Sequence, residues 1–313
     1  MSSLLALQAQ ARGLDLSSRK RVLTDMSGTH LSGFRGRGME FEEHRIYEPG
    51  DDVRAIDWRV TARTGQAHIK RFREERERPV YLVMDMAPSM FFATRGVFKS
   101  VLAAEALGLL GWAAVANRDR VGGFIATPAG LTDIRPAGGR RGLLQYFDQL
   151  ATVHSQALEQ GQGQGQGNVT VVDALKHLQR LARGGAVVVL MSDFQQLPHT
   201  AAPLLQKIAS RCELIAGIVS DPFERALPNK SGLPVASADQ QQRWFLKREQ
   251  KAQQDWAQRF VEREAFWTKQ LQPFGTHWLS LDTAQPLREQ LARGLGLVHK
   301  RQVAEQVPLQ VSG

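Results

Sequence analysis

Two uninterrupted apolar runs that each end in an aspartate constrain the fold of this chain most. The first is PVYLVMD at residues 79–85, and the second is AVVVLMSD at residues 186–193. Short apolar runs without polar alternation are typical of strands that are buried on both faces of a parallel sheet. Such a sheet needs helices on both faces, so the sequence predicts an α/β protein.

Segments of helical length separate the apolar runs beyond Pro79. Strands that alternate with helices of ten or more residues indicate a doubly wound, mostly parallel sheet. An insertion is expected at residues 221–272, because it begins with several prolines and ends in a long amphipathic segment. The expected strands are 80–84, 120–126, 131–135, 186–191, 213–219 and 277–281, and the expected helices are 97–117, 142–150, 170–182, 201–211 and 285–295.

The region before Pro79 has a different pattern and is expected to form a separate unit, residues 1–78. Leucines at helical spacing predict an N-terminal helix within residues 1–20. After a glycine-rich loop, β-prone pieces at 53–60 and 67–72 predict a small β-rich subdomain. Residues 79–300 then form the α/β domain, and residues 301–313 form a flexible tail.

Charge and cysteine content narrow the classes of partner and compartment. The net charge is +9, but residues 35–78, the most arginine-dense region, hold 11 basic and 10 acidic residues. No basic stripe interleaved with aromatic residues is present, so no nucleic-acid partner is expected.

The single cysteine, Cys212, fits a reducing compartment. The apolar region 101–116 is too short to span a bilayer, so a cytoplasmic protein without a transmembrane segment is expected.

Oxygen-bearing side chains follow the two aspartate-ended runs. Asp85 and Asp193 face one crevice if their strands are neighbours, because ligands collect at the carboxyl ends of the strands where the strand order reverses. Ser89 follows Asp85 closely, and Thr170 opens a later helix. Carboxylates and hydroxyls are suited to Mg²⁺. The same residues are often helix caps and turn residues, so both interpretations stay open.

The segment Asp85-Met86-Ala87-Pro88-Ser89 resembles the Asp-x-Ser-x-Ser motif of the von Willebrand factor A fold. The resemblance implies a metal site completed by Asp193 and by a threonine position that falls on Thr170 or on Val169. Ala87 stands where the motif has its first serine, so one hydroxyl ligand is absent. The implied Mg²⁺ site, formed by Asp85, Ser89, Thr170 and Asp193, is therefore weakened.

The preceding segment resembles the signature of the bacterial family called domain-of-unknown-function 58. The resemblance rests on GRGMEF at 36–41, RIYEPGDDVR at 45–54, IDW at 56–58 and TAR at 61–63. In that family the signature precedes a von Willebrand factor A-like domain. The resemblance implies a MoxR-type AAA+ ATPase and other von Willebrand factor A-like proteins as partners, and a chaperone-like role in the assembly or maturation of other proteins.

The charged residues of the signature admit two interpretations. Paired arginines and carboxylates make directional contacts, so they could form an internal network that locks the β-rich subdomain to the sheet. They could equally form a docking surface for a partner, anchored by an aromatic residue. The residues concerned are Arg45, Asp51, Asp52, Arg54, Asp57, Trp58, Arg59 and Arg63.

No catalytic motif accompanies these features. The sequence has no Gly-x-Ser-x-Gly elbow, no His-Glu-x-x-His and no phosphate-binding loop. A noncatalytic protein-interaction module or adaptor is therefore the leading hypothesis. The alternatives are a metal-dependent hydrolase acting on phosphoesters, which would use the same strand-end acids, and a nucleic-acid scaffold.

Overall fold

The computed structural model describes residues 2–11, 14, 39–48, 53, 56–74, 77–94, 96–159, 168–228, 234–236, 243–245 and 250–296. The chain divides into two compact units. One comprises residues 18–77, and the other, called here the sheet unit, comprises residues 1–17 and 78–313. The Gly-Gln run at 161–167 and the tail at 301–313 lie outside the described residues.

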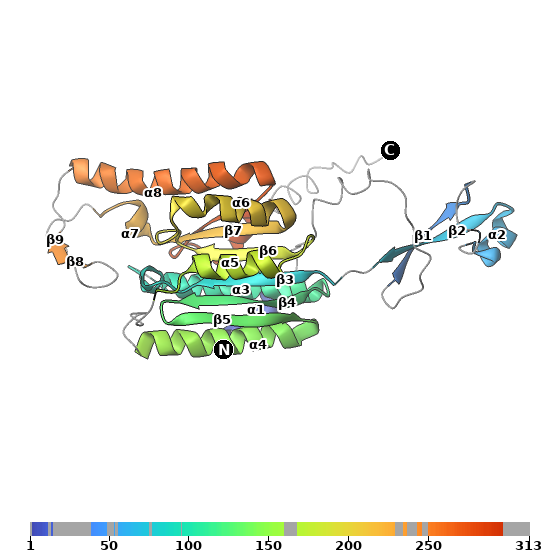
Figure 1. Cartoon of the computed structure of the whole chain (residues 1–313), viewed down its shortest axis with the longest axis horizontal. Coiled ribbons are helices and arrows are strands. Elements are labelled where there is room, and N and C mark those ends of the chain that lie inside the picture. Colours follow the sequence, from blue (N-terminus) through green and yellow to red (C-terminus); the bar gives the residue numbers. More distant parts are fainter. Residues whose placement is uncertain are drawn as a thin grey trace, which may run out of the picture. The chain divides into compact units, whose positions relative to one another are not determined.

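A six-stranded, mostly parallel sheet forms the centre of the sheet unit (Figure 1). Its strand order is β10-β7-β6-β3-β4-β5, and only the edge strand β5 runs antiparallel to its neighbour. All six strands were expected from the sequence. Their bounds are β3 Pro79–Asp85, β4 Arg120–Thr127, β5 Gly130–Ala137, β6 Val187–Ser192, β7 Glu213–Ser220 and β10 His277–Asp282.

The two aspartate-ended runs form the neighbouring central strands β3 and β6. They pair in parallel from Val80 opposite Val187 to Met84 opposite Met191, and these residues are fully buried or nearly so. The chain proceeds outward from β3 to β4 and β5 on one side, and from β6 to β7 and β10 on the other. The carboxyl ends of β3 and β6 therefore flank the point where the strand order reverses, which is where open α/β sheets bind ligands.

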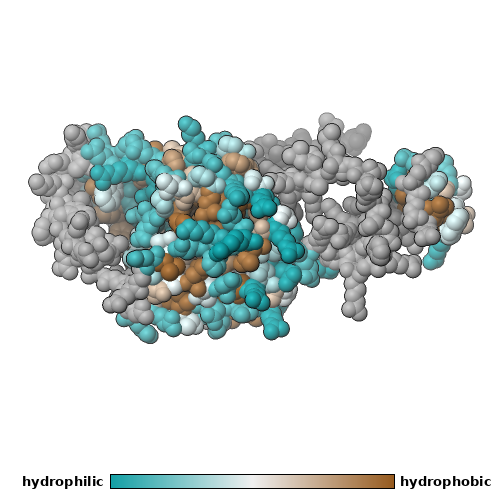
Figure 2. All heavy atoms as spheres, in the orientation of Figure 1, coloured by the Kyte–Doolittle hydropathy of each residue, from teal (hydrophilic) through white to brown (hydrophobic). Residues whose placement is uncertain are grey.

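Helices cover both faces of the sheet. Apolar side chains of α1, α3, α4 and α9 form one core cluster with the sheet, and those of α5, α6 and α8 form the other. On the side seen in Figure 2 hydrophilic side chains surround smaller hydrophobic areas of the sheet unit. The helix bounds are α1 Ser2–Gln10, α3 Lys99–Ala116, α4 Gly139–Glu159, α5 Val171–Leu181, α6 Ala202–Arg211, α8 Gln250–Leu271 and α9 Leu287–Gly294.

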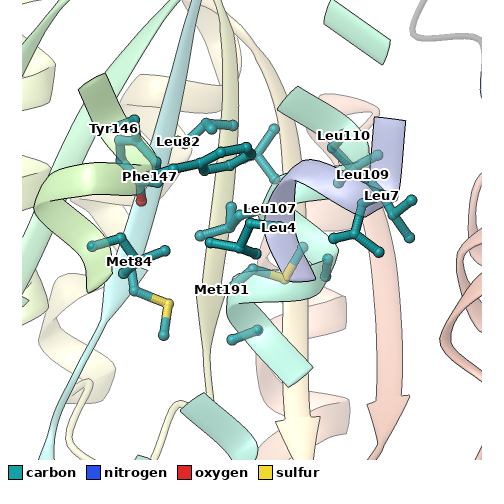
Figure 3. Packing of buried hydrophobic residues seen from close by; sticks show 14 of the residues in the cluster. Leu4, Leu7, Leu82, Met84, Leu107, Leu109, Leu110, Tyr146, Phe147 and Met191 are labelled. Carbon is teal, nitrogen blue, oxygen red and sulfur yellow. The ribbon is translucent and has the colours of Figure 1, made fainter. Parts of the chain in front are cut away.

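The N-terminal helix α1 belongs to the sheet unit, whereas the sequence analysis grouped it with the β-rich segment. Leu4 and Leu7 are buried against α3, as Figure 3 shows. The indole Nε1 of Trp112 donates a hydrogen bond of 3.0 Å to the carbonyl of Leu4. A methyl group at Gly108 would lie 3.0 Å from Leu7 Cδ1, so this glycine lets the two helices approach closely. Apolar packing thus decides to which unit the helix belongs.

Helix α3 has the length and hydropathy of a membrane-spanning helix. It is 18 residues long, longer than the 16-residue apolar region that the sequence analysis judged too short, and its mean hydropathy is 1.4. However, 78% of it is buried within the protein. Burial of this extent is typical of a core helix in an α/β domain, and α3 packs on the central strands.

The smaller unit contains the antiparallel pair β1 Met39–Ile46 and β2 His68–Glu74, together with the helix α2 Trp58–Thr64. The β-prone piece at 53–60 was expected to be part of the β-rich subdomain. Ile56 does form a β-bridge with Ile69, but residues 58–60 begin α2 instead. The Asp57 carboxylate accepts hydrogen bonds from the backbone N–H groups of Arg59 and Val60, which caps a helix at this point. Gly65 ends the helix in a left-handed conformation (φ 75°).

Two further segments differ from expectation in extent. Helix α4 has 21 residues rather than the nine expected, because its apolar positions continue at helical spacing as far as Ala157. The predicted insertion at 221–272 contains the short helix α7 Pro222–Arg225 and the antiparallel pair β8 Pro234–Ala236 and β9 Arg243–Phe245 before α8. The remaining short elements are η3 Pro88–Phe91, η4 His199–Ala201 and η5 Gln272–Phe274.

Candidate functional site at the carboxyl edge of the sheet

A row of four buried aspartates lines the carboxyl edge of the sheet, at the ends of the neighbouring strands β10, β7, β6 and β3. None is more than 8% exposed. Asp85 and Asp193 were predicted from the sequence; the other two were not, although they also follow apolar runs. In sheet order the four are Asp282, Asp221, Asp193 and Asp85, and they are called the strand-end row here.

Asp85 lies at the end of β3 and is held by two hydrogen bonds. Its Oδ1 accepts the backbone N–H of Ala87 at 3.0 Å, and its Oδ2 accepts the hydroxyl of Ser192 at 2.6 Å. Burial, together with the nearby charge of Asp193, raises the pKa of the Asp85 carboxyl to about 7, against the opposing effect of these hydrogen bonds and of Lys99. Asp85 is therefore partly protonated near neutral pH.

Asp193 forms a fully buried ion pair with Lys99, the first residue of α3. Lys99 Nζ lies 2.8 Å from Asp193 Oδ2 and 2.6 Å from Glu224 Oε1 of α7. Burial raises the pKa of Asp193, but the Lys99 charge and the hydrogen bonds to the carboxylate together outweigh burial, and the net shift is downward. Burial lowers the pKa of Lys99, but Asp193 and Glu224 outweigh it, and the net shift is upward. Both groups are therefore charged at neutral pH.

Aromatic packing holds the turn that carries Asp193. The next residue, Phe194, has a positive φ of 56°, which is uncommon for a residue other than glycine. Its ring packs on Trp267 and Trp278 at centroid distances of 5.5 Å and 5.2 Å. The second carboxylate oxygen of Asp193 accepts the backbone N–H of Gln195 at 3.0 Å. Tertiary packing thus stabilises a strained backbone that positions Asp193.

The two hydroxyl residues predicted to bind metal have different surroundings. Ser89 lies in η3, and its hydroxyl helps to lower the pKa of Asp193, yet it falls short of hydrogen-bond geometry with any described residue. Thr170 is the N-cap of α5, and its backbone N–H and hydroxyl both donate to Asp173, at 3.0 Å and 3.3 Å. The structure therefore brings Ser89 to Asp193, whereas the hydrogen bonds of Thr170 serve the helix cap.

These residues do not fit a bound magnesium ion. Mg²⁺ requires an octahedral shell of oxygens, usually anchored by one or two carboxylates. Of the two carboxylates present, Asp193 is bonded to the Lys99 ammonium and Asp85 to the Ser192 hydroxyl. Ala87 supplies no oxygen from its side chain. Among the described residues no group of three His, Cys, Asp or Glu side chains is arranged to hold a metal ion.

The other two members of the strand-end row are also satisfied internally. Asp221 accepts hydrogen bonds from the hydroxyls of Thr94 and Thr283 and from the backbone N–H of Phe223. Burial raises the pKa of Asp221, but these hydrogen bonds outweigh it and the net shift is downward. Asp282 lies 3.4 Å from the Arg225 guanidinium. The row therefore joins strands, loops and α7 into one network.

The residues of the charged signature that the structure describes are mostly exposed. Arg45 pairs with Glu48 at 2.8 Å, and Asp57 caps α2. Trp58, on α2, is 68% exposed, and Arg59 and Arg63 are exposed on the same helix. Neither arginine side chain makes an ion pair with another described residue. The remaining predicted members, Asp51, Asp52 and Arg54, lie outside the described residues.

Comparison with known proteins identifies the family. Residues 43–265 match the family model described as "Protein of unknown function DUF58". The chain belongs to this family. It is 33% identical over 234 residues to uncharacterised proteins of Mycobacterium bovis and of two strains of Mycobacterium tuberculosis. The match covers 74% of this chain and 71% of each relative.

One solved structure is also similar to this DUF58 chain. It is a conserved hypothetical protein, BatB, from Bacteroides thetaiotaomicron. The sequence identity is 12% and the TM-score is 0.40, over 71% of this chain and 99% of that chain. A likeness at this level supports no conclusion about fold or function.

Proposed function

We propose that the chain is a noncatalytic protein-interaction module that acts in the cytoplasm with a MoxR-type AAA+ ATPase, and with other von Willebrand factor A-like proteins, in the chaperone-like assembly or maturation of other proteins. The resemblance of residues 36–63 to the family signature motivates the choice of partner. The strand-end row supports a noncatalytic role, because its four carboxylates are engaged in contacts within the protein.

We further propose that the sheet unit has the doubly wound von Willebrand factor A-like fold. The support is its topology. If the six sheet strands are numbered in chain order, the order across the sheet is 3-2-1-4-5-6, with only strand 3 antiparallel. Doubly wound folds have this strand order, which supports the proposal, and in such folds ligands bind at the reversal, here between strands 1 and 4.

The observation that carries the proposal is the exposure of Trp58 on α2. A tryptophan that is 68% exposed offers a large apolar surface with a hydrogen-bond donor, and tryptophan is enriched among the residues that dominate binding energy. Arg59 and Arg63, one helical turn apart, add two positive charges on one side of the helix. Helix α2 thus combines an aromatic anchor with charges that orient an acidic partner surface.

Binding of the full chain to its cognate MoxR-type ATPase tests the proposal. Trp58→Ala is expected to weaken binding at least tenfold, and Arg59→Gln with Arg63→Gln to weaken it and reduce its dependence on salt. The matched control is Lys207→Gln with Arg211→Gln, which removes two exposed charges at the same spacing from α6. Wild-type binding is expected to be insensitive to chelator. Equal binding by all three variants would overturn the proposed surface, and no binding by the wild type would overturn the partner.

The alternative, metal-dependent hydrolysis of phosphoesters, would need a carboxylate pair that is open to an ion and a water molecule. Asp193 instead contacts the Lys99 ammonium, and both side chains are fully buried. Turnover of phosphodiesters with Mg²⁺ or Mn²⁺ that Asp193→Asn abolishes would favour hydrolysis over the proposed function.

A further inference from the structure

Lys99 is the one fully buried lysine side chain among the described residues, and it lies where the sequence predicted a metal ion. It begins α3, yet its ammonium contacts Asp193 and Glu224, which lie 94 and 125 positions further along the chain. One of these is Asp193, a member of the predicted metal site. A buried charge persists only when it is paired, and here two carboxylates provide the pairing.

We propose that the Lys99 ammonium is a resident cation that takes the place of a divalent ion at the carboxyl edge of the sheet. The site is then complete without metal, and its positive charge is part of the chain. Three buried or nearly buried carboxylates lie around this charge: Asp193 and Glu224 contact the ammonium directly, and Asp85 ends the neighbouring strand.

The charge balance of the site supports this assignment. The Lys99 ammonium lies 2.8 Å from the Asp193 carboxylate and 2.6 Å from the Glu224 carboxylate, and the Asp85 carboxyl is also buried at this edge of the sheet. Without Lys99 these carboxylates would have no buried counterion, and a cation from solution would be the natural replacement. The Ser89 hydroxyl, buried and without a hydrogen-bond partner among the described residues, is an additional oxygen beside Asp193 that such an ion could use.

The resident cation also ties three elements together. Its contacts link the start of α3, the end of β6 and α7 in the insertion. An exchangeable metal ion would make these links depend on ion concentration, whereas a lysine keeps them permanently. The edge of the sheet is therefore a constitutive structure that responds neither to chelation nor to magnesium.

Thermal unfolding of the isolated chain tests the inference, with the wild type and two variants compared at constant ionic strength. The wild-type Tm is expected to be unchanged by EDTA, MgCl₂ or MnCl₂. Lys99→Ala removes the cation and leaves a cavity, so its lowered Tm is expected to recover in part with MnCl₂ or methylammonium chloride. Lys99→Met is the matched control, because its side chain fills the cavity and leaves no space for either cation.

Two results would overturn the inference. One is evidence of a metal site in the wild type. Such evidence would be a Tm that rises with MgCl₂ or MnCl₂, or binding of Mn²⁺, detected by electron paramagnetic resonance, that Asp193→Asn removes. The other is a Lys99→Ala variant that responds to the two cations no more than Lys99→Met does. If Lys99→Ala does not fold in buffer without an added cation, folding rescued by methylammonium supports the inference and failure of rescue counts against it. The inference concerns the isolated chain, so its failure is distinguishable from a failure to bind the ATPase.

Discussion

Lys99 Nζ lies 2.8 Å from Asp193 Oδ2, and neither side chain has any exposed surface. The two residues belong to different elements and are 94 positions apart. Their contact lies beside the reversal point of the sheet, where an α/β protein ordinarily presents a ligand site. In this chain the Lys99–Asp193 ion pair occupies that position. Substitutions that change the charges at this edge are therefore expected to change the stability of the protein as well.

The buried ion pair predicts an order of destabilisation among substitutions. Asp193→Asn is expected to lower the free energy of unfolding by about 3–5 kcal/mol, because it leaves the buried Lys99 ammonium with one charged partner. Glu224→Gln is expected to cost less, since the Glu224 side chain is 10% exposed. Urea denaturation monitored by tryptophan fluorescence measures both values, and a larger cost for Glu224→Gln would contradict the assignment of Asp193 as the principal partner.

The raised pKa of Asp85 predicts a pH dependence of stability. In the folded chain the Asp85 carboxyl keeps its proton up to about pH 7, whereas in the unfolded chain it loses the proton near pH 4. The contribution of Asp85 to the free energy of unfolding is therefore largest at low pH and is lost as pH rises toward 7, with a slope of up to ~1.4 kcal/mol per pH unit. Burial is the main cause of the raised pKa, and the charge of Asp193 adds to it; the Ser192 hydroxyl, the backbone N–H of Ala87 and the Lys99 charge oppose it.

Asp85→Asn isolates that contribution. Other carboxylates, such as Asp221 with its lowered pKa, change stability in the opposite direction, so the difference between wild type and variant is the quantity to measure. Between pH 4 and pH 7 the stability of Asp85→Asn is expected to improve relative to wild type as pH rises. Denaturation curves at several pH values provide the difference, and a constant difference would show that Asp85 keeps an ordinary pKa.

Gly123 in β4 predicts a severe backbone effect. Its φ is 149°, and a methyl group there would lie 1.9 Å from the carbonyl oxygen of Leu82 on the neighbouring strand. Gly123→Ala is therefore expected to cost roughly 3 kcal/mol or more, or to prevent folding. Gly130→Ala is the matched control at the start of β5, where nothing lies within 4 Å of the added methyl group. Comparable stabilities of the two variants, from thermal unfolding, would contradict this explanation.

The fold was largely predictable because its strands are buried on both faces. Burial of this kind leaves apolar runs such as 79–85 and 186–193 in the sequence, and each became a central strand. Residues 58–60 were expected in a β-prone piece but form the first turn of α2, and the side-chain cap from Asp57 decided the outcome. Local capping overrode propensity, which is a weak preference.

The candidate site was only half predictable. Asp85 and Asp193 were located because they end apolar runs, and the same signal at Asp221 and Asp282 was available but not used. Lys99 left no comparable signal. Lysine is rarely buried, and its partners lie far along the chain, so the sequence shows only a polar residue before an apolar helix. Local sequence patterns do not predict a contact between residues that only the tertiary structure brings together.

The packing of α1 on α3 supplies the last prediction. Leu7 is 8% exposed and packs in the core cluster, whereas Leu5, two residues away, is 43% exposed. Leu7→Ala is expected to lower the free energy of unfolding by about 2–4 kcal/mol, because it removes buried methyl groups from the contact with Gly108. Leu5→Ala is expected to change it by less than ~0.5 kcal/mol. Urea denaturation measures both, and hydrogen exchange at residues 2–10 reports detachment of the helix; equal effects of the two substitutions would mean that α1 does not pack on the sheet unit through this face.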